Sequence, residues 1–567
     1  MLVSAKGLLF SILLFSFGSS SSQQLTQSHF DLHEVAEVTV DDYSDNIGNI
    51  LKLDGVYLDH GSTHSTLKLY ITAQGYHQLE QNDIKYKWRP IEVFSPNMKT
   101  VDDLKDYFHK SDCLEPMDFY PTYEAYEQMM FDFESKYPDI CEIIEIGILS
   151  SGRKILAAHI GDQLGVNEEE PNFLYTSTMH GDELAGFPIM LMYIDMLLCN
   201  YGTDERITEL VNNINIYINP LANPDGTYRG GNATVAQSIR FNNQFADLNR
   251  NYPDFQDGPN PDGRETQEEA LLFIDFAEQF EIHLSCNIHS GVEVCNYPHD
   301  TFVDRPSDES WWERVMREYA TTAQDNSPNG YMTFLDNGVT NGFDWFEANG
   351  GRQDFVTFFH RTREFTLEIS NDKRLNAALL PTFWDYNRDA LLNYMEEAQY
   401  GLRGTITDCN TGIPVLAEII IPEHDSLNSS VFSSISDGSY FRFLDEGQYD
   451  IIYVAEGYDT LRTQVDIIDK TMVRFDASIC PMLSTSTEDS PLVGFNLYHR
   501  DNKIFIDNGN EIIKGRAVIY NIDGQKVHES DINDMSINLS ENLSFGIYIV
   551  NIETNDTFSS HKVLIHN

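Results

Sequence analysis

The chain contains 567 residues and carries a formal net charge of −52, with 89 acidic against 37 basic side chains. A charge of this sign and size excludes nucleic-acid binding and argues against binding to anionic membrane surfaces. It favours solubility and a mild attraction for cationic substrates or Ca²⁺, although a solvated acidic surface explains it better. The length predicts about three or four domains, one of which can enclose a large hydrophobic core.

The first 23 residues have the layout of a secretory signal peptide. A single lysine, Lys6, precedes the apolar run LLFSILLFSF, and a serine-rich patch follows it. The run is short for a membrane span, and no other stretch approaches the roughly 20 apolar residues that a span requires. We therefore expect an exported protein without stable insertion in a membrane.

Export permits disulfide bonds, and the sequence has 7 cysteines. Seven are too few for a disulfide scaffold, and an odd number leaves at least one of them unpaired. The candidate pairs are Cys113 with Cys141 and Cys409 with Cys480, each of which would bracket a structural unit.

The rest of the chain falls into segments that differ in their predicted secondary structure. Residues 30–95 alternate strand-like runs with polar segments, which predicts a small α+β module; a pro-segment, an inhibitory lid and a plain folding module all remain open. From residue 115 to residue 400 strands alternate with helices, which indicates an α/β domain with a buried mixed sheet. Residues 402–480 and 492–567 contain short strands separated by turns, and each segment predicts a compact all-β unit.

The first candidate functional motif is His180-Gly-Asp-Glu183, which follows an apolar strand-like run and precedes a helix-like one. On such a turn an imidazole and a carboxylate can point at one ion, and Zn²⁺ accepts both kinds of ligand. A catalytic zinc site also needs a third protein ligand and one position for water. The motif alone is weak evidence, because His-x-x-Glu arises by chance in a chain of this length.

Three later segments offer the missing parts. His289 ends a predicted strand and can serve as the third ligand, although a strand-end histidine is more often a packed residue. Asn249 and Arg250 are adjacent in a predicted turn, where they can present an amide and a guanidinium to one carboxylate. In the strand FTLEIS, period-two alternation places Glu368 opposite the apolar side chains, so that it can face a cavity.

The motifs HGDE, NPDG, DLNRNYPD, NYPHD, NGFDWFEANGGRQD and FTLEIS occur in this order at appropriate spacing. With them, residues 115–480 resemble the zinc metallocarboxypeptidases, specifically the carboxypeptidase N/E/D branch. Each motif is weak singly, but the ordered set is specific. The resemblance implies a multidomain fold, in which an α/β catalytic domain with a mixed sheet flanked by helices (115–400) precedes a transthyretin-like β-sandwich (402–480). A C-terminal β-sandwich would follow at residues 492–567.

For the reaction, the resemblance implies one Zn²⁺ with water in its fourth position, held by His180, Glu183 and His289. Asp247 would orient His180 from behind. Glu368 would act as the general base that takes a proton from the zinc-bound water and passes it to the leaving amine, and Arg240 would stabilise the oxyanion. Asp182 replaces the Asn or Arg that is usual inside the first motif, and its extra carboxylate can repel an anionic terminus.

For the substrate, Asn249 and Arg250 match the pair that grips the terminal carboxylate in this family, which makes the enzyme an exopeptidase. Asp300 and Gln353 match pocket residues of the branch that prefers C-terminal Lys or Arg, because a buried carboxylate disfavours apolar partners. Phe346 stands where the family usually has a tyrosine. A hydroxyl that hydrogen-bonds the substrate is thereby lost, so we expect weaker binding rather than inactivity.

Residues 492–567 resemble the sorting domains that Bacteroidetes-type bacteria use for type IX secretion. The resemblance rests on the DGQKV segment, the GIYIVNI strand and the terminal KVLI strand. A β-sandwich used for adhesion is the alternative. Sorting would make the outer-membrane secretion machinery a partner and would place the protein outside the cell or on its surface.

We therefore predict a secreted zinc-dependent exopeptidase that releases Lys or Arg from the C-termini of peptides or proteins. A zinc amidase or peptidoglycan-trimming hydrolase, and a non-catalytic peptide-binding protein, are the alternatives on the same scaffold. Asn249, Arg250 and Asp300 argue against the amidase, because they recognise a free carboxylate and a cationic side chain. The complete set of ligands and base argues against a non-catalytic protein.

Overall fold

The computed structural model describes residues 25–108 with short gaps, residue 113, residues 115–482, and residues 496–565 with short gaps. The predicted signal peptide, residues 1–23, lies outside the described residues. The chain divides into two compact units, Met1–Phe94 and Ser95–Asn567. Within the described part of the chain, none of the helices has the length and apolar character of a membrane span.

The first unit contains a four-stranded sheet in the order β2-β3-β1-β4, with β1 antiparallel to both β3 and β4. Alternate apolar residues of β1 and β3, such as Val38 and Leu69, form its core together with Leu79 of α3. The bounds of its elements are α1 (Gln27–Phe30), β1 (Val35–Asp41), α2 (Ile47–Ile50), β2 (Val56–Leu58), β3 (Thr66–Thr72), α3 (Ala73–Gln81) and β4 (Lys87–Trp88).

The second unit begins with an eight-stranded mixed sheet in the order β13-β12-β14-β11-β9-β10-β8-β7. Its centre is parallel, because β11 runs parallel to β9 and β14, and β9 runs parallel to β10. Every residue of β11 and β14 is buried, as expected for central strands of a sheet that is covered on both faces. The bounds are β7 (Cys141–Ile148), β8 (Lys154–Ile160), β9 (Asn172–Ser177), β10 (Asn215–Asn219), β11 (Leu284–His289), β12 (Glu293–Tyr297), β13 (Val339–Asn341) and β14 (Arg363–Ile369).

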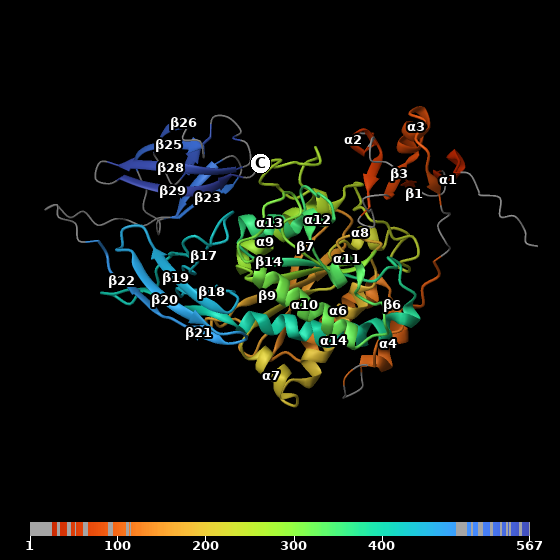
Figure 1. The fold of residues 1–567 in the computed structure, drawn as a ribbon, viewed down its shortest axis with the longest axis horizontal. Coiled ribbons are helices and arrows are strands. Elements are labelled where there is room, and N and C mark those ends of the chain that lie inside the picture. The colour runs from red at the N-terminus through yellow and green to blue at the C-terminus, as the bar shows by residue number, and fades with distance from the viewer. Residues whose placement is uncertain are drawn as a thin grey trace, which may run out of the picture. The chain divides into compact units, whose positions relative to one another are not determined.

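Helices cover both faces of this sheet, with α6, α10 and α14 on one side and α9 and α13 on the other (Figure 1). Helix α6 is apolar almost all round and is buried along most of its length, as a helix between a sheet and other helices must be. The predicted α/β domain with a mixed sheet and flanking helices is therefore confirmed. The longer helices are α5 (Tyr123–Lys136), α6 (Gly186–Asn200), α7 (Glu205–Val211), α9 (Glu268–Phe280), α10 (Glu309–Asp325), α13 (Arg352–Phe359) and α14 (Leu380–Glu396).

Shorter elements complete this region. The strands β5 and β6 pair in parallel ahead of α5, and the remaining helices lie in the connections between the larger elements. Their bounds are β5 (Met98–Lys99), α4 (Val101–Phe108), β6 (Tyr120–Pro121), α8 (Pro224–Thr227), η1 (Leu248–Arg250), α11 (Phe334–Gly338), α12 (Gly342–Trp345), η2 (Ala377–Leu379) and η3 (Glu397–Gln399).

Two further sheets follow the α/β region and share one hydrophobic core. Ile406 and Tyr440 of one sheet contribute to this core, as do Ile419 and Ile451 of the other. The likeness to transthyretin stays a prediction. The strands are β15 (Gly401–Asp408), β16 (Glu418–Ile420), β17 (Val431–Phe432), β18 (Ser439–Arg442), β19 (Gly447–Val454), β20 (Leu461–Ile467), β21 (Met472–Arg474) and β22 (Ala477–Ile479).

The C-terminal segment contains a three-stranded and a four-stranded antiparallel sheet, with Ile504, Ile519 and Val550 in a common core. Its strands are β23 (Asn496–Arg500), β24 (Lys503–Asp507), β25 (Gly515–Asn521), β26 (Lys526–Ile532), β27 (Ser536–Asn538), β28 (Gly546–Thr554) and β29 (Phe558–Ile565).

The disulfides agree with the sequence prediction at one position and contradict it at another. Cys409 is bonded to Cys480, as predicted. The predicted pair of Cys113 with Cys141 is wrong, because Cys113 is bonded to Cys199 at the end of α6 and Cys141 is a buried thiol that begins β7.

Candidate metal centre and substrate pocket

His180 and Glu183 lie on the turn that connects β9 to α6, as the sequence predicts. This turn packs against a second turn, where Asn223 caps the short helix α8 and its amide group donates to the carbonyl of Met179 at 3.0 Å. Gly181 has no room for a side chain, since a Cβ there would lie 2.3 Å from the backbone of Gly226. The NPDG motif, one of the ordered motifs of the sequence, thus supports the turn that carries the two candidate ligands.

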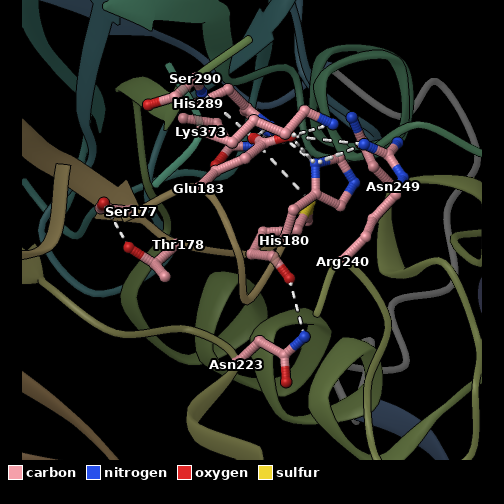
Figure 2. Close-up of polar contacts among 12 residues, drawn as sticks. Ser177, Thr178, His180, Glu183, Asn223, Arg240, Asn249, His289, Ser290 and Lys373 are labelled. Atoms are coloured by element: carbon pink, nitrogen blue, oxygen red, sulfur yellow. Dashed lines mark hydrogen bonds and ion pairs between the residues drawn. The ribbon is translucent and has the colours of Figure 1, made fainter. Parts of the chain in front are cut away.

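The third candidate ligand, His289, ends the neighbouring parallel strand β11 and brings its imidazole to the same place (Figure 2). Its Nδ1 atom lies 2.8 Å from Glu183 Oε2 and 3.1 Å from His180 Nδ1, and His180 Nδ1 lies 3.0 Å from Glu183 Oε1. All three side chains are buried. Strands that end side by side at one edge of the sheet therefore assemble a group that the sequence spreads over more than a hundred residues.

This donor set fits a zinc ion. One ligand atom from each of the three residues lies within 4.8 Å of the others, as three ligands of one ion require. Two imidazole nitrogens and a carboxylate oxygen form one of the ligand sets of catalytic zinc, whose bonds are about 2.0–2.2 Å long. Burial lowers the pKa of His289 to about 4. The neutral imidazole, which is the form that binds a metal, is therefore present at neutral pH.

In each histidine the second ring nitrogen, Nε2, contacts a polar side chain that can fix the orientation of the ring. His180 Nε2 lies 3.0 Å from Asp247 Oδ1, and the Nε of Arg240 donates to Asp247 Oδ2 at 2.8 Å. His289 Nε2 lies 2.9 Å from the amide group of Asn287. The sequence predicted the contact of Asp247 but not that of Asn287, although Asn287 lies two residues before His289 and hence on the same face of β11.

Glu368 lies beside the three ligands. The register of β11 and β14 pairs it directly with His289, and its side chain is buried. Gly291 borders the carboxylate, since a Cβ at that position would lie 3.9 Å from Glu368 Oε2. Two strand ends thus place a carboxylate next to the candidate metal position, where a general base is required.

Two cations border the same group (Figure 2). The Nη1 atom of Arg240 lies 3.4 Å from Glu183 Oε1 and donates to His180 Nδ1 at 3.1 Å. Lys373, which follows β14 and which the sequence did not indicate, places its Nζ 3.7 Å from Glu183 Oε1. Burial opposes the ionisation of Glu183, but His180 and His289 hold its pKa well below the usual range.

Three of the predicted substrate residues, Asn249, Arg250 and Phe346, lie near one another. Asn249 lies in η1, and its side-chain oxygen accepts a hydrogen bond from the backbone N–H of Arg352 at 2.9 Å. Because the oxygen is used in this way, the NH₂ group is the part of the Asn249 amide that suits a carboxylate. The guanidinium of Arg250 lies 6.0 Å from the ring centroid of Phe346, so the two predicted contacts of the substrate are neighbours.

Asp300 and Gln353, the two residues that the sequence assigns to the substrate side chain, are both buried and contact each other. The carboxylate oxygen Oδ1 of Asp300 accepts hydrogen bonds from Gln353 at 3.2 Å and from Asn296 at 3.0 Å. Burial and the nearby charge of Asp354 raise the pKa of Asp300 to about 8. Gly342 makes room for this carboxylate, since a Cβ there would lie 1.6 Å from Asp300 Oδ1.

Asp182, the unusual residue inside the first motif, is also buried. Its Oδ2 atom lies 3.7 Å from the guanidinium of Arg374. The cation offsets the negative charge that the sequence led us to expect beside the ligands.

Comparisons with known proteins agree with this fold and with the two resemblances that the sequence indicates. Residues 126–395 match the family model described as zinc carboxypeptidase, and residues 500–566 match that of the secretion system C-terminal sorting domain. Human carboxypeptidase D is 30% identical over 401 residues, which are 66% of this chain and 28% of that protein. Mouse carboxypeptidase M is 30% identical over 63% of this chain and 82% of its own length.

Among solved structures, carboxypeptidase A from Helicoverpa armigera has the same fold, with a TM-score of 0.50 and 18% identity over 65% of this chain and 98% of that one. The His-Glu-His group near the strand ends of the mixed sheet fits the ligand set of zinc peptidases. The chain belongs to the zinc carboxypeptidase family and carries a C-terminal sorting domain, so both predicted resemblances are confirmed. It spans 28% of the length of human carboxypeptidase D.

Proposed function

We propose that this chain is a secreted zinc-dependent exopeptidase that hydrolyses the C-terminal peptide bond and releases Lys or Arg. The observation that carries the proposal is the buried group of His180, Glu183 and His289, with Glu368 paired to His289 in the sheet. Asn249 and Arg250, which we call the substrate clamp, follow Asp247, the residue that contacts His180. His180, Glu183 and His289 would hold one Zn²⁺. When bound, such an ion lowers the pKa of a water ligand and polarises a carbonyl oxygen.

The residues around this group have distinct roles in the proposed reaction. Glu368 takes the proton from the attacking water and gives it to the leaving amine. Arg240, whose guanidinium borders the ligands, donates hydrogen bonds to the oxygen on which negative charge develops. Asp247 keeps both Arg240 and His180 in place through one hydrogen bond to each.

The substrate clamp restricts the reaction to free C-termini. The NH₂ group of Asn249 and the guanidinium of Arg250 would bind the terminal carboxylate, because a guanidinium and an amide together match its two oxygens. A peptide with a blocked terminus offers no negative charge to this pair. We therefore assign the chain to the exopeptidases.

The pocket of Asp300 and Gln353 favours a basic terminal side chain. An ionised carboxylate buried without a cation is costly, and a lysine or arginine side chain of the substrate supplies that cation. Asp300 with its two hydrogen-bonded neighbours therefore selects Lys and Arg over apolar residues. The sorting domain suggests secretion or attachment to the cell surface, so we expect extracellular peptides or proteins as substrates.

The proposal is tested with matched peptides that end in Arg, Lys, Leu or Glu, each with a free and an amidated C-terminus, in the presence and absence of a chelator. Chelator-sensitive release of Arg and Lys from the free termini alone supports every part. Release of Leu instead would keep the exopeptidase and reject the role of Asp300. Zinc binding without release from any peptide would favour an amidase or a non-catalytic binding protein.

A further inference from the structure

A buried arginine, which the proposed reaction does not use, is linked to the candidate metal centre through hydrogen bonds. Arg352 is the first residue of α13, and its side chain is buried. Its Nη2 atom lies 3.1 Å from the carboxylate of Glu364, and its guanidinium lies 5.0 Å from the ring centroid of Phe273. Burying a charged pair of this kind costs desolvation energy and is weak evidence for a contribution to stability. Its remaining contacts point to a different role.

The second arm of the guanidinium starts a chain of hydrogen bonds that ends at a metal ligand. Nη1 of Arg352 donates to the hydroxyl of Thr176 at 2.6 Å. That hydroxyl lies 3.1 Å from the side-chain oxygen of Asn287, and the amide of Asn287 lies 2.9 Å from His289 Nε2. The register of the sheet pairs Thr176 with Asn287, so the backbone fixes this sequence of contacts.

The chain of contacts is compatible with a metal on the opposite side of the imidazole. A ring that binds a metal through Nδ1 carries its proton on Nε2 and needs a hydrogen-bond acceptor there. The amide nitrogen of Asn287 now faces Nε2, and a rotation of the amide that exchanges its nitrogen and oxygen provides this acceptor. The NH₂ group of Asn287 then faces the hydroxyl of Thr176. Because that hydroxyl has two lone pairs, it can accept from both Asn287 and Arg352. Arg352 can only donate hydrogen bonds, so its contact with the Thr176 hydroxyl is the same in both orientations of the Asn287 amide.

We infer that Arg352 is a positioning residue that holds the imidazole of His289 in place for zinc through Thr176 and Asn287. The inference rests on the proposed zinc site. The side chain and the backbone of Arg352 have different contacts, because it is the backbone N–H that donates to Asn249. A substitution of the Arg352 side chain therefore disturbs the metal ligand and leaves the contact to the substrate clamp.

The test is the double variant Arg352→Met/Glu364→Gln, which removes both charges and leaves no buried ion without a partner. Its zinc affinity is measured by competition with a chelator, together with its Tm without zinc and its kcat and KM with saturating zinc. Loss of an outer partner of a metal-binding histidine weakens metal binding roughly 10–100-fold. Because Arg352 reaches His289 through two other side chains, we expect a loss near the lower end of this range, and an unchanged KM for a peptide ending in Arg.

A second variant and a matched control distinguish the loss of these hydrogen bonds from a general loss of stability. Thr176→Val interrupts the chain of hydrogen bonds while Arg352 and Glu364 remain, and it should reproduce the loss of zinc affinity. The control Arg314→Met/Glu397→Gln removes another arginine–glutamate pair, with an Nη2-to-Oε2 distance of 3.1 Å, which does not touch the site. It should leave zinc affinity unchanged whatever it does to Tm.

The outcomes separate this inference from the proposed function. Wild-type zinc affinity in folded Arg352→Met/Glu364→Gln and Thr176→Val variants, with an active wild-type enzyme, would overturn the role of Arg352 alone. A loss of affinity that is equally large in the Arg314 control would show a general effect of stability and would also overturn it. A wild-type chain that binds no zinc would overturn the proposed function and this inference together.

Discussion

The buried carboxyl of Asp300 predicts that the preference for basic C-terminal residues depends on pH. Burial, together with the charge of Asp354, raises the pKa of Asp300 to about 8, against the opposing effects of the Asn296 hydrogen bond and the Arg250 charge. A cationic side chain is attracted by the ionised carboxylate and not by the neutral acid. The preference is therefore fully present above pH 8 and is lost as the pH falls below this value.

The size of the effect follows from the same pKa. Below about pH 8 each further pH unit reduces the ionised fraction of Asp300 about tenfold, which corresponds to about 1.4 kcal/mol of selective binding. Between pH 8 and pH 6 the preference for a cation should fall roughly 50-fold. The candidate zinc ligands and Glu368 also affect the rate, so the measurement must compare two substrates on which their effect is the same.

Two peptides that differ only in charge provide this comparison. One ends in arginine and the other in citrulline, in which a neutral urea replaces the guanidinium. The ratio of their kcat/KM values cancels all ionisations that the two reactions share. We expect the ratio to rise with pH and to level off above about pH 8, and to be flat in Asp300→Asn. A wild-type preference that is independent of pH, or a pH dependence that survives in Asp300→Asn, would refute the reasoning.

Three other predictions concern the reaction, the metal and the fold. Glu368→Gln should lower kcat roughly 10²–10⁴-fold while the zinc content stays the same, because only proton transfer is lost; a wild-type kcat would rule out the base. Asp247→Ala should weaken zinc binding roughly 10–100-fold in chelator competition, and unchanged affinity would contradict its hold on His180. Cys409→Ser/Cys480→Ser opens a disulfide with a sequence separation of 71 and should lower the free energy of unfolding by about 4 kcal/mol in urea, whereas an unchanged midpoint would contradict the bond.

The candidate ligands could be predicted because their signals are local. His180 and Glu183 are three residues apart on one turn, and His289 and Glu368 each lie in a segment that the sequence predicts as a strand. The adjacency of the two strands, which pairs His289 with Glu368, is a property of the sheet. The sequence related His289 to Glu368 only through the resemblance to a family.

Contacts that depend on packing alone could not be predicted. Cys199 lies in the last turn of α6 and is bonded to Cys113, whereas the sequence paired Cys113 with Cys141 because the two would bracket a structural unit. Lys373 and Arg352 gave no sign of their position, because a charged residue after a strand or at the start of a helix is ordinary on a surface. Both are placed near the metal centre by the path of the chain around β14.

The central claim, that one zinc ion held by His180, Glu183 and His289 drives the removal of a C-terminal residue, is tested most directly by a metal titration. Zinc is added stepwise to the metal-free chain while the release of arginine from a peptide is followed. The account predicts no release without zinc, a rise to a plateau at one zinc per chain, and no recovery in His289→Ala. Release of arginine by the metal-free chain, or full zinc binding without any release, would contradict it.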